Sequence, residues 1–379
     1  MSKIGVITYS FTVDNYGQVL QYLATQKYLQ SLGYEAFLVD AKGWKRFSKG
    51  WIVSKFYGLK KRVLTFLFKS LKKRTQTKES ENKKITIFDE WASATKRQER
   101  KHPRHFNDFK KQFFCMQSDY YNGILKSDYD AFCVGSDQTW SSCDQHWFLN
   151  WVPKRIKKFS IAPSVGHHVF SDLEIKICRQ SLRRFDFITV RENNGLDFCK
   201  RCEIYDAKKI LDPTFLLTQK EYNAYVKEEL SKPYVLVYLL GGEISISVQE
   251  IVAFCESKGL DIKYVESQGR VENIKEKCYA TVGEWIGLIK NASYVITNSF
   301  HGMAFSIIYR KPFLVLPLIN MMEGMNGRIF DLAENMQLQT RIYKNDLEQI
   351  FAPIDWTCAE QKIAENKLLL DGMVKSLNL

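Results

Sequence analysis

Long apolar runs are missing from this 379-residue sequence. None approaches the roughly 18 residues that a membrane-spanning helix needs. The opening run "KIGVITYS" is short, strand-like and soon followed by Asp14, so we do not expect a signal peptide. Neither G-x-G-x-x-G nor G-x-x-x-x-G-K-[ST] occurs. This argues against the dinucleotide and P-loop nucleotide sites that those motifs build.

Cysteine spacing excludes two further classes. The chain has nine cysteines, an odd number, without the spacing of a disulfide framework. "CKRC" (Cys199 and Cys202) is its single C-x-x-C, and no Cys/His cluster nearby supplies two more zinc ligands. We therefore expect incidental thiols, no metal, no cofactor and a reducing, cytoplasmic compartment.

Positive charge is concentrated in one segment. The net charge is +13, and residues 42–111 hold 22 Lys and Arg against 6 Asp and Glu, so this segment carries the whole excess. Residues 45–75 resemble an amphipathic basic helix, which suits peripheral contact with the anionic inner face of a membrane. Helices that simply leave their lysines in water are the alternative. Nucleic acid is not expected as a partner, because no recognised binding motif accompanies the charge.

Strands and helices alternate along most of the chain. A strand (3–10), a helix ending at Gly33 and a second strand (35–40) open it as a βαβ unit, which predicts a parallel sheet. A second alternating set begins at Tyr234. We predict an α/β protein of two Rossmann-like doubly wound domains. The first covers 1–215, with a basic helical insertion at about 42–127, and the second covers 216–379 and ends in a terminal helix.

The connection between the predicted domains contains two further elements. "YDAKKILDPTFLL" is interpreted as strand interrupted by an Asp212-Pro213 turn. "TQKEYNAYVKEELSKP" begins with a capping box, Thr218 and Glu221, which predicts a helix ending before Pro233. Since ligands bind at the carboxyl ends of strands in such sheets, the cleft between the two domains is the expected site.

His301, one of six histidines, follows the predicted strand "YVIT" and begins a helix. Free backbone N–H groups at a helix start favour anions, and an imidazole there can donate to phosphate or move a proton. Ser299 can cap that helix or bind an oxyanion, and Gly302 allows close approach of a ligand. The alternative is a histidine that merely caps the helix.

Other strand exits offer further polar groups. "GSDQTW" places Ser136, Asp137 and Gln138 after a strand; Asp137 could take a proton from a hydroxyl, or could simply cap a helix. Arg191, in "TVRENNG", has the forked geometry that suits carboxylate or phosphate, although a surface Arg–Glu pair is equally ordinary. Arg328 stands at a predicted helix start, where it could reach an anion or be solvated.

The ordered set of motifs resembles the polysaccharide pyruvyl transferase family. It comprises "NYGQVLQYLATQKYLQSLGYE", "YDAFCVGSDQTW", "FDFITVRENNG", "LDPTFLL", "ASYVITNSFHGMAFSIIYRKPF" and "NGRIFDLAENMQL", spanning about residues 3 to 342. The resemblance implies a glycosyltransferase-B-like arrangement of the two domains. It also implies transfer of a pyruvyl group from phosphoenolpyruvate to two hydroxyls of a sugar, free or lipid-linked, as a ketal.

The resemblance also implies roles for residues. His301 and Arg191 match positions implicated in donor binding. Many members carry Arg two residues before this His, where this chain has Ser299, so the missing charge could come from Arg191 or from Arg328.

We assign the remaining roles as hypotheses. His301 and Asp137 are the expected acid/base groups, and Ser299 and Gly302 join the two arginines in donor binding. The acceptor is expected at a second set of residues: Asn15, Gln18, Ser136 and Gln138. A sugar-nucleotide-dependent glycosyltransferase and a non-catalytic anion-binding protein are the competing interpretations.

Overall fold

The computed structural model describes residues 1–9, 11–39, 95–117, 120–121, 124–125, 128–227, 232–266 and 277–379, together with positions 93, 272 and 274. Most of the predicted basic insertion (42–127), including the amphipathic segment 45–75, lies outside these residues, so membrane contact there stays a prediction. Among the described residues, no helix has the length and apolar character needed to cross a bilayer.

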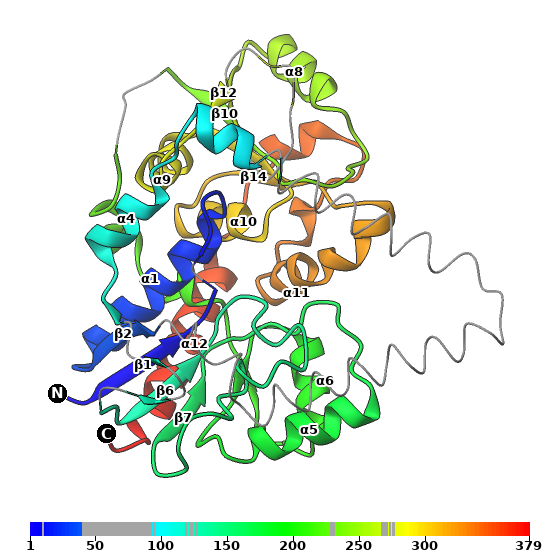
Figure 1. The fold of residues 1–379 in the computed structure, drawn as a ribbon. Helices are drawn as coiled ribbons and strands as arrows, with labels where there is room; N and C mark the ends of the chain where they lie inside the picture. Colours follow the sequence, from blue (N-terminus) through cyan, green and yellow to red (C-terminus); the bar gives the residue numbers. More distant parts are fainter. Residues whose placement is uncertain are drawn as a thin grey trace, which may run out of the picture.

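The first half of the chain forms a five-stranded sheet in which all neighbouring strands are parallel, in the order β3-β2-β1-β6-β7 (Figure 1). Its strands are β1 (Lys3–Ile7), β2 (Glu35–Val39), β3 (Met116–Gln117), β6 (Ala131–Val134) and β7 (Lys157–Ser160). They are short and mostly buried, because helices or loops cover both faces of a parallel sheet. The edge strand β3 comes from within the predicted insertion.

The second half repeats this order with its own parallel strands, β12-β11-β10-β13-β14. These are β10 (Tyr234–Tyr238), β11 (Asp261–Val265), β12 (Lys277–Cys278), β13 (Tyr294–Thr297) and β14 (Phe313–Val315). Two minor pairs complete the strands: β4 (Tyr120–Tyr121) with β5 (Ile124–Leu125), and β8 (Thr189–Val190) with β9 (Lys208–Lys209).

Helices fill the connections. The first half has α1 (Tyr16–Ser31), α4 (Phe106–Phe113), α5 (Asp172–Leu182), α6 (Asn193–Arg201), η2 (Pro213–Leu216) and α7 (Gln219–Asn223). The second has α8 (Val248–Ser257), α9 (Val282–Asn291), α10 (Phe300–Ile308), η3 (Asn320–Asn326), α11 (Gly327–Asn335), η4 (Gln339–Arg341), η5 (Leu347–Phe351) and α12 (Thr357–Lys375). The two Rossmann-like units form the predicted glycosyltransferase-B-like α/β fold.

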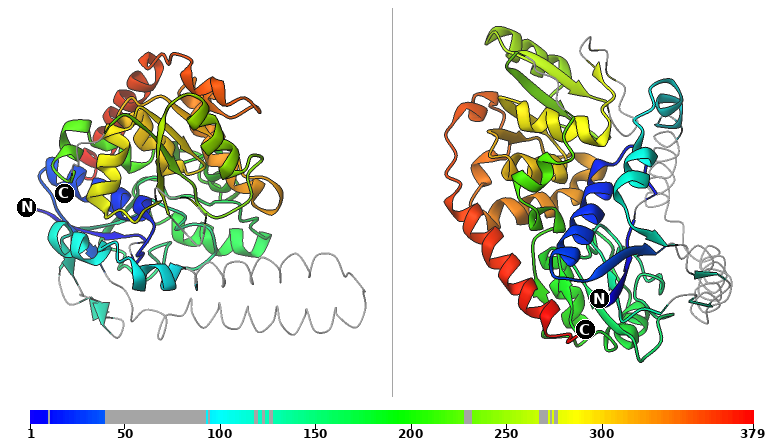
Figure 2. Two further views of the ribbon diagram at one scale, coloured as in Figure 1. Left: turned by 90° about the horizontal axis from the view of Figure 1, so that it is seen from above. Right: turned by 90° about the vertical axis from the view of Figure 1, so that its left-hand side faces the viewer.

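The two halves share part of their hydrophobic core. Tyr16 of α1 stacks on Trp285 of α9, with 4.9 Å between ring centroids, and its hydroxyl donates to the Ala280 carbonyl at 2.7 Å. Helix α12 returns along the first half, where Tyr28 donates to Asp371 at 2.8 Å (Figures 1 and 2). Both chain termini therefore lie beside the first sheet.

Two local predictions were wrong. Residues 214–216, expected as strand after the Asp212-Pro213 turn, belong to the 3-10 helix η2 (Pro213–Leu216), because the Asp212 carboxylate accepts from the Thr214 N–H and Pro213 fits the first helical position. The helix expected to end before Pro233 is much shorter: α7 covers Gln219–Asn223, and residues 228–231 are not among those described. Its capping box is present as predicted.

Candidate functional site

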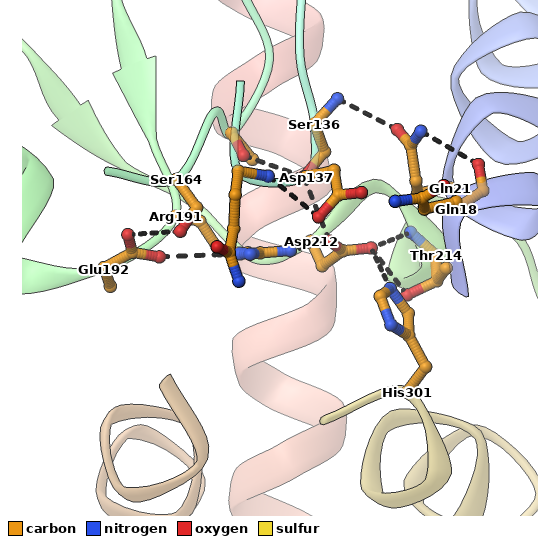
Figure 3. A network of polar contacts seen from close by, with 12 residues as sticks. Gln18, Gln21, Ser136, Asp137, Ser164, Arg191, Glu192, Asp212, Thr214 and His301 are labelled. Atoms are coloured by element: carbon orange, nitrogen blue, oxygen red, sulfur yellow. Dashed lines mark hydrogen bonds and ion pairs between the residues drawn. The ribbon is translucent and has the colours of Figure 1, made fainter. Parts of the chain in front are cut away.

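Asp212 is the centre of a buried polar network between the two halves (Figure 3). Its Oδ2 accepts from Arg191 Nη1 at 2.8 Å and from Ser136 Oγ at 3.0 Å. Its Oδ1 accepts from the Thr214 N–H at 3.0 Å and from the Thr214 hydroxyl at 2.9 Å. On the side of the second half, His301 Nε2 lies 3.8 Å from Oδ1, an ion-pair distance too long for a hydrogen bond.

The charge of Asp212 is fixed by these neighbours. Burial alone would raise the pKa of its carboxyl, but the His301 imidazole, the Arg191 guanidinium and the Thr214 N–H together hold the pKa well below the usual range. Asp212 is therefore a permanent anion at neutral pH. It serves to compensate and orient its cationic partners, and it cannot act as the proton donor.

Arg191 leaves β8 buried between two carboxylates. Its side chain is 2% exposed, and Nε lies 3.5 Å from Glu192 Oε2. Burial opposes the cation, but Asp212, Glu192 and Asp137 outweigh it and raise the pKa of Arg191. The guanidinium also lies 4.9 Å from the ring centre of Phe300, in the second half. Its Nη2 is buried and has no hydrogen-bond partner among the described residues, so one donor nitrogen is free for an anion.

His301 occupies the first turn of α10, one residue after the start of that helix. Its Nε2 is buried and makes no hydrogen bond within the part of the chain that the structure describes. Its ring packs on Gly17 of α1, where an added Cβ would lie 1.9 Å from Nδ1. The glycine in "NYGQ" thus makes room for the imidazole. The histidine from one half is placed by a glycine and an aspartate from the other.

Asp137 lies in the turn after β6. Gly135 begins this turn with φ +113°, and a Cβ there would meet the Ile161 carbonyl at 2.3 Å; Asp137 itself has φ +59°. Its Oδ1 accepts from the Gln138 N–H at 2.8 Å, whereas Oδ2 is buried without a hydrogen-bond partner among the described residues. Ser136 is fully buried, and its hydroxyl donates to Asp212 and to the Ala162 carbonyl.

Arg328 approaches the network from α11 of the second half. Gln138, with its amide oriented by hydrogen bonding, accepts from Nη1 and Nη2 of Arg328 at 3.1 Å each. Burial and the neighbouring Arg191 cation lower the pKa of Arg328 to about 10, despite opposing attraction from Glu192, Asp137 and Asp212. The guanidinium groups of Arg191 and Arg328 therefore lie near each other and repel each other. Such an arrangement is suited to a multiply charged anion.

A cavity of about 510 Å³ lies between the halves next to this network. Its wall includes Asn15 and Gln18 from the first half and Asn298, Phe300 and Arg328 from the second. Polar and apolar residues complete the lining: Phe11, Thr12, Val13, Asp14, Thr95, Lys96, Leu240, Gly241, Leu318, Met325 and Ile329. Arg328 also lines a smaller cavity of about 60 Å³, together with Gln138 and Glu192 among others.

The structure places some predicted residues in supporting positions. Ser136 cannot touch an acceptor, because it is fully buried beneath Asp212; this corrects its assignment to acceptor binding. Ser299 caps α10, its Oγ accepting from the Gly302 N–H at 3.3 Å. A Cβ at Gly302 would meet Thr297 Oγ1 at 2.4 Å, so this glycine is required for packing of the helix on β13.

Three acidic or amide residues of the site were not predicted. Asp212 was interpreted as a turn residue, Glu192 as half of a surface ion pair, and Asn298 was not singled out. Glu192 is buried and accepts from Ser164 Oγ at 2.6 Å, and Asn298 pairs with the backbone of Leu240 through both amide atoms. For Asp212, the available signal in the sequence was an acidic residue directly before Pro213 in the mostly apolar motif "LDPTFLL".

Within the described residues, no group of three or more His, Cys, Asp or Glu side chains is arranged to hold a metal ion. Cys199 and Cys202 are buried. Burial raises the pKa of the Cys202 thiol to about 12, as expected for unreactive cysteines.

Comparisons with known proteins agree with the resemblance of the motifs. The family model described as polysaccharide pyruvyl transferase matches residues 15–318. A search of curated proteins found no match. Among solved structures, UDP-GlcNAc 2-epimerase from Methanocaldococcus jannaschii is similar at 10% identity and a TM-score of 0.45, covering 95% of this chain and 92% of that one. UDP-N-acetylglucosamine 2-epimerase from Rickettsia bellii is similar at 11% identity and a TM-score of 0.45, covering 97% of this chain and 88% of that one. The spinosyn rhamnosyltransferase SpnG is similar at 13% identity and a TM-score of 0.40, covering 99% of this chain and 96% of that one.

Proposed function

Because the chain belongs to the polysaccharide pyruvyl transferase family, we propose that it transfers a pyruvyl group from phosphoenolpyruvate to two hydroxyls of a sugar, in a surface polysaccharide or its lipid-linked precursor, forming a ketal. The observation that carries this proposal is the convergence of three cationic or proton-carrying groups, His301, Arg191 and Arg328, at the cleft between the halves. His301 and Arg191 each present a buried nitrogen without a hydrogen-bond partner among the described residues.

The donor explains why both arginines are required. Phosphoenolpyruvate carries a carboxylate and a phosphate, and each suits a guanidinium fork. Arg191 offers its free Nη2, while Arg328 comes from the opposite half and faces the same network. Ser299 supplies no charge, because its hydroxyl oxygen caps α10. We assign the charge that this turn lacks to Arg191 and Arg328 jointly.

Two protons leave the sugar hydroxyls; one proton is delivered to C3 of the donor and one ends on the released phosphate. The methylene carbon C3 of the donor accepts a proton while the first sugar oxygen bonds to C2 and loses its own proton. The C2–O bond to phosphate then breaks, and the second sugar oxygen bonds to C2 as its proton leaves. The products are the ketal and inorganic phosphate, and no electrons are exchanged with a cofactor.

His301 and Asp137 divide this proton transfer. Imidazole is the commonest acid/base group in enzymes, and the Asp212 carboxylate lies 3.8 Å from Nε2 of this ring. We assign protonation of C3 to His301. Asp137, whose Oδ2 is unpaired among the described residues, is assigned to the acceptor hydroxyl. Asn15 and Gln18 line the 510 Å³ cavity on the acceptor side.

A donor screen tests the proposal. Wild-type protein is incubated with phosphoenolpyruvate or with UDP-, GDP- and dTDP-sugars, across free and lipid-linked β-galactosides and amino sugars. We expect phosphate release and an acceptor mass gain of one pyruvyl ketal with phosphoenolpyruvate. Nucleoside diphosphate release would instead identify a glycosyltransferase. Binding of phosphoenolpyruvate without turnover of any acceptor would identify an anion-binding protein.

A further inference from the structure

Helix α6 of the first half is capped by a residue of the second half. Asp331 Oδ2 accepts from the Asn193 backbone N–H at 2.8 Å, and Asp331 Oδ1 accepts from the Asn193 side-chain Nδ2 at 2.9 Å. Asn193 is the first residue of α6. Lys209 Nζ donates to Asn193 Oδ1 at 2.8 Å and holds the amide in this orientation. The two bonds join the halves at one side of the network around Asp212.

The helix needs this cap because its own N-cap residue is engaged elsewhere. Glu192 makes no side-chain hydrogen bond to the start of α6. Instead its Oε1 accepts from Ser164 Oγ at 2.6 Å and from the Val165 N–H at 2.9 Å, and its Oε2 pairs with Arg191. The free N–H at the helix start favours an anion, and the Asp331 carboxylate supplies it.

The position of this link relates it to the two arginines. Asn193 is two residues after Arg191, and Asp331 is one helical turn after Arg328 on α11. The same small cavity is lined by Arg328, Asp331 and Glu192. Each end of the link therefore lies within three residues of one of the two arginines.

The link also joins two segments that each carry a cation. Burial and the proximity of Arg191 lower the pKa of Arg328, which means that the cation is disfavoured there. We propose that Asp331 is a positioning residue: by capping α6 across the halves, it holds Arg191 and Arg328 at the spacing of a doubly anionic donor before the donor arrives. This inference rests on the proposed function for the identity of the donor.

The link itself is tested without any ligand, by amide hydrogen–deuterium exchange with mass spectrometry. Asp331→Ala removes both acceptors. Peptides covering residues 189–196 and 325–332 should then exchange faster than in wild-type protein. Asp355→Ala is the matched control, because Asp355 accepts from the Thr357 N–H at 2.9 Å, a bond between two residues of the second half. Its effect should stay within residues 353–360.

The consequence for the donor is tested by calorimetry and steady-state kinetics with phosphoenolpyruvate. For Asp331→Ala we expect Kd and KM to rise about tenfold, the effect of losing about 1.4 kcal/mol. Saturating phosphoenolpyruvate should restore the spacing of the two arginines, so kcat should stay within about twofold of the wild-type value. Asp331→Glu, which keeps a carboxylate, should recover part of the affinity, and Asp355→Ala should bind like wild type. A purely structural role would not separate KM from kcat in this way.

Unchanged exchange at 189–196 in Asp331→Ala overturns the link. Faster exchange with unchanged phosphoenolpyruvate affinity overturns the positioning role. If wild-type protein binds no phosphoenolpyruvate, the proposed function fails, and the same exchange comparison still decides whether Asp331 joins the halves.

Discussion

The two halves contain sheets of the same strand order but supply different side chains to the cleft. The first half supplies buried acids, among them Asp137 and Asp212, with Arg191 enclosed by them. The second half supplies His301 from α10 and Arg328 from α11. A shared topology therefore sets where the side chains emerge, and the sequence at each exit decides what the cleft can bind.

This difference makes the site depend on both halves. Asp212 compensates Arg191 within the first half and His301 across the cleft. Arg328 has no carboxylate partner within ion-pair distance among the described residues; it donates to the neutral Gln138. Arg191 of the first half is thus paired with carboxylates, whereas Arg328 of the second half has only a neutral partner within the described residues. The following changes should affect the two halves differently.

Replacing the central acid should have the largest effect. Asp212→Asn leaves Arg191 buried beside a neutral amide and removes the anion that holds His301. We expect unfolding free energy to fall by about 3–5 kcal/mol and turnover to become undetectable, because an uncompensated buried charge is strongly destabilising. Urea unfolding and phosphate release from phosphoenolpyruvate measure the two effects. Asp346→Asn, an exposed helix cap, is the control and should change neither by much. Wild-type stability in Asp212→Asn would contradict this role.

Removing the imidazole should abolish chemistry without unfolding the protein. For His301→Gln we expect kcat to fall about 10³-fold, within the range for a lost acid/base group, and the unfolding free energy to change by less than about 1 kcal/mol. His168→Gln removes a histidine paired with Glu174 outside the network and should keep its activity. Equal losses in both variants would show that the effect is not specific to the cleft.

Displacing the imidazole without changing it should cost less. A Cβ on Gly17 would lie 1.9 Å from His301 Nδ1, so Gly17→Ala must move the ring. We expect kcat to fall about 10²-fold, the cost of a misplacement of about 1 Å. Gly372→Ala in α12 is the matched control, because an added Cβ meets no atom within 4 Å. That variant should be fully active and slightly more stable. Full activity of Gly17→Ala would contradict the packing.

Neutralising the cation of the second half should weaken donor binding and stabilise the protein. For Arg328→Gln we expect KM for phosphoenolpyruvate to rise about 10- to 100-fold, as for a lost charge-assisted hydrogen bond. Because burial and Arg191 disfavour this cation, the urea midpoint should rise or stay constant. The opposite pattern, an unchanged KM with lower stability, would make Arg328 a structural residue.

Acid should weaken the first half through Asp212. Its pKa is lower in the folded protein than in the unfolded chain, where it is about 3.9. The stability it contributes is therefore fully present above about pH 4 and is lost as pH falls below that value. Unfolding free energy measured in urea should drop more steeply between pH 5 and 3 in wild-type protein than in Asp212→Asn. Parallel curves would contradict the depressed pKa.

Local sequence patterns predicted the fold better than the site. The strands predicted around Ala131–Val134, Tyr234–Tyr238 and Tyr294–Thr297 were confirmed. Buried parallel strands are short continuous apolar runs, and such runs can be recognised directly in the sequence. His301 and Arg191 were found because each follows such a strand directly. The network around Asp212 was not predictable, since it depends on segments about 90 residues apart meeting across the cleft.

Residue type also misled the interpretation of some positions. Ser299 and Gly302 have the composition of an oxyanion site, yet their atoms are used for capping and packing inside the second half. Ser136 follows a strand as Asp137 does, but the turn directs it inward to Asp212. Adjacent residues in a strand exit point to opposite sides, and the sequence does not reveal which side is the cleft.

The central claim is that His301, held by Asp212 of the other half, protonates the donor during pyruvyl transfer. The most direct test is transfer from phosphoenolpyruvate to a lipid-linked β-galactoside in D₂O, followed by mass spectrometry of the product and by phosphate release. The account predicts one phosphate per ketal, one deuterium in each product methyl group, and loss of both signals in His301→Gln. Ketal formation at the wild-type rate in His301→Gln would contradict it.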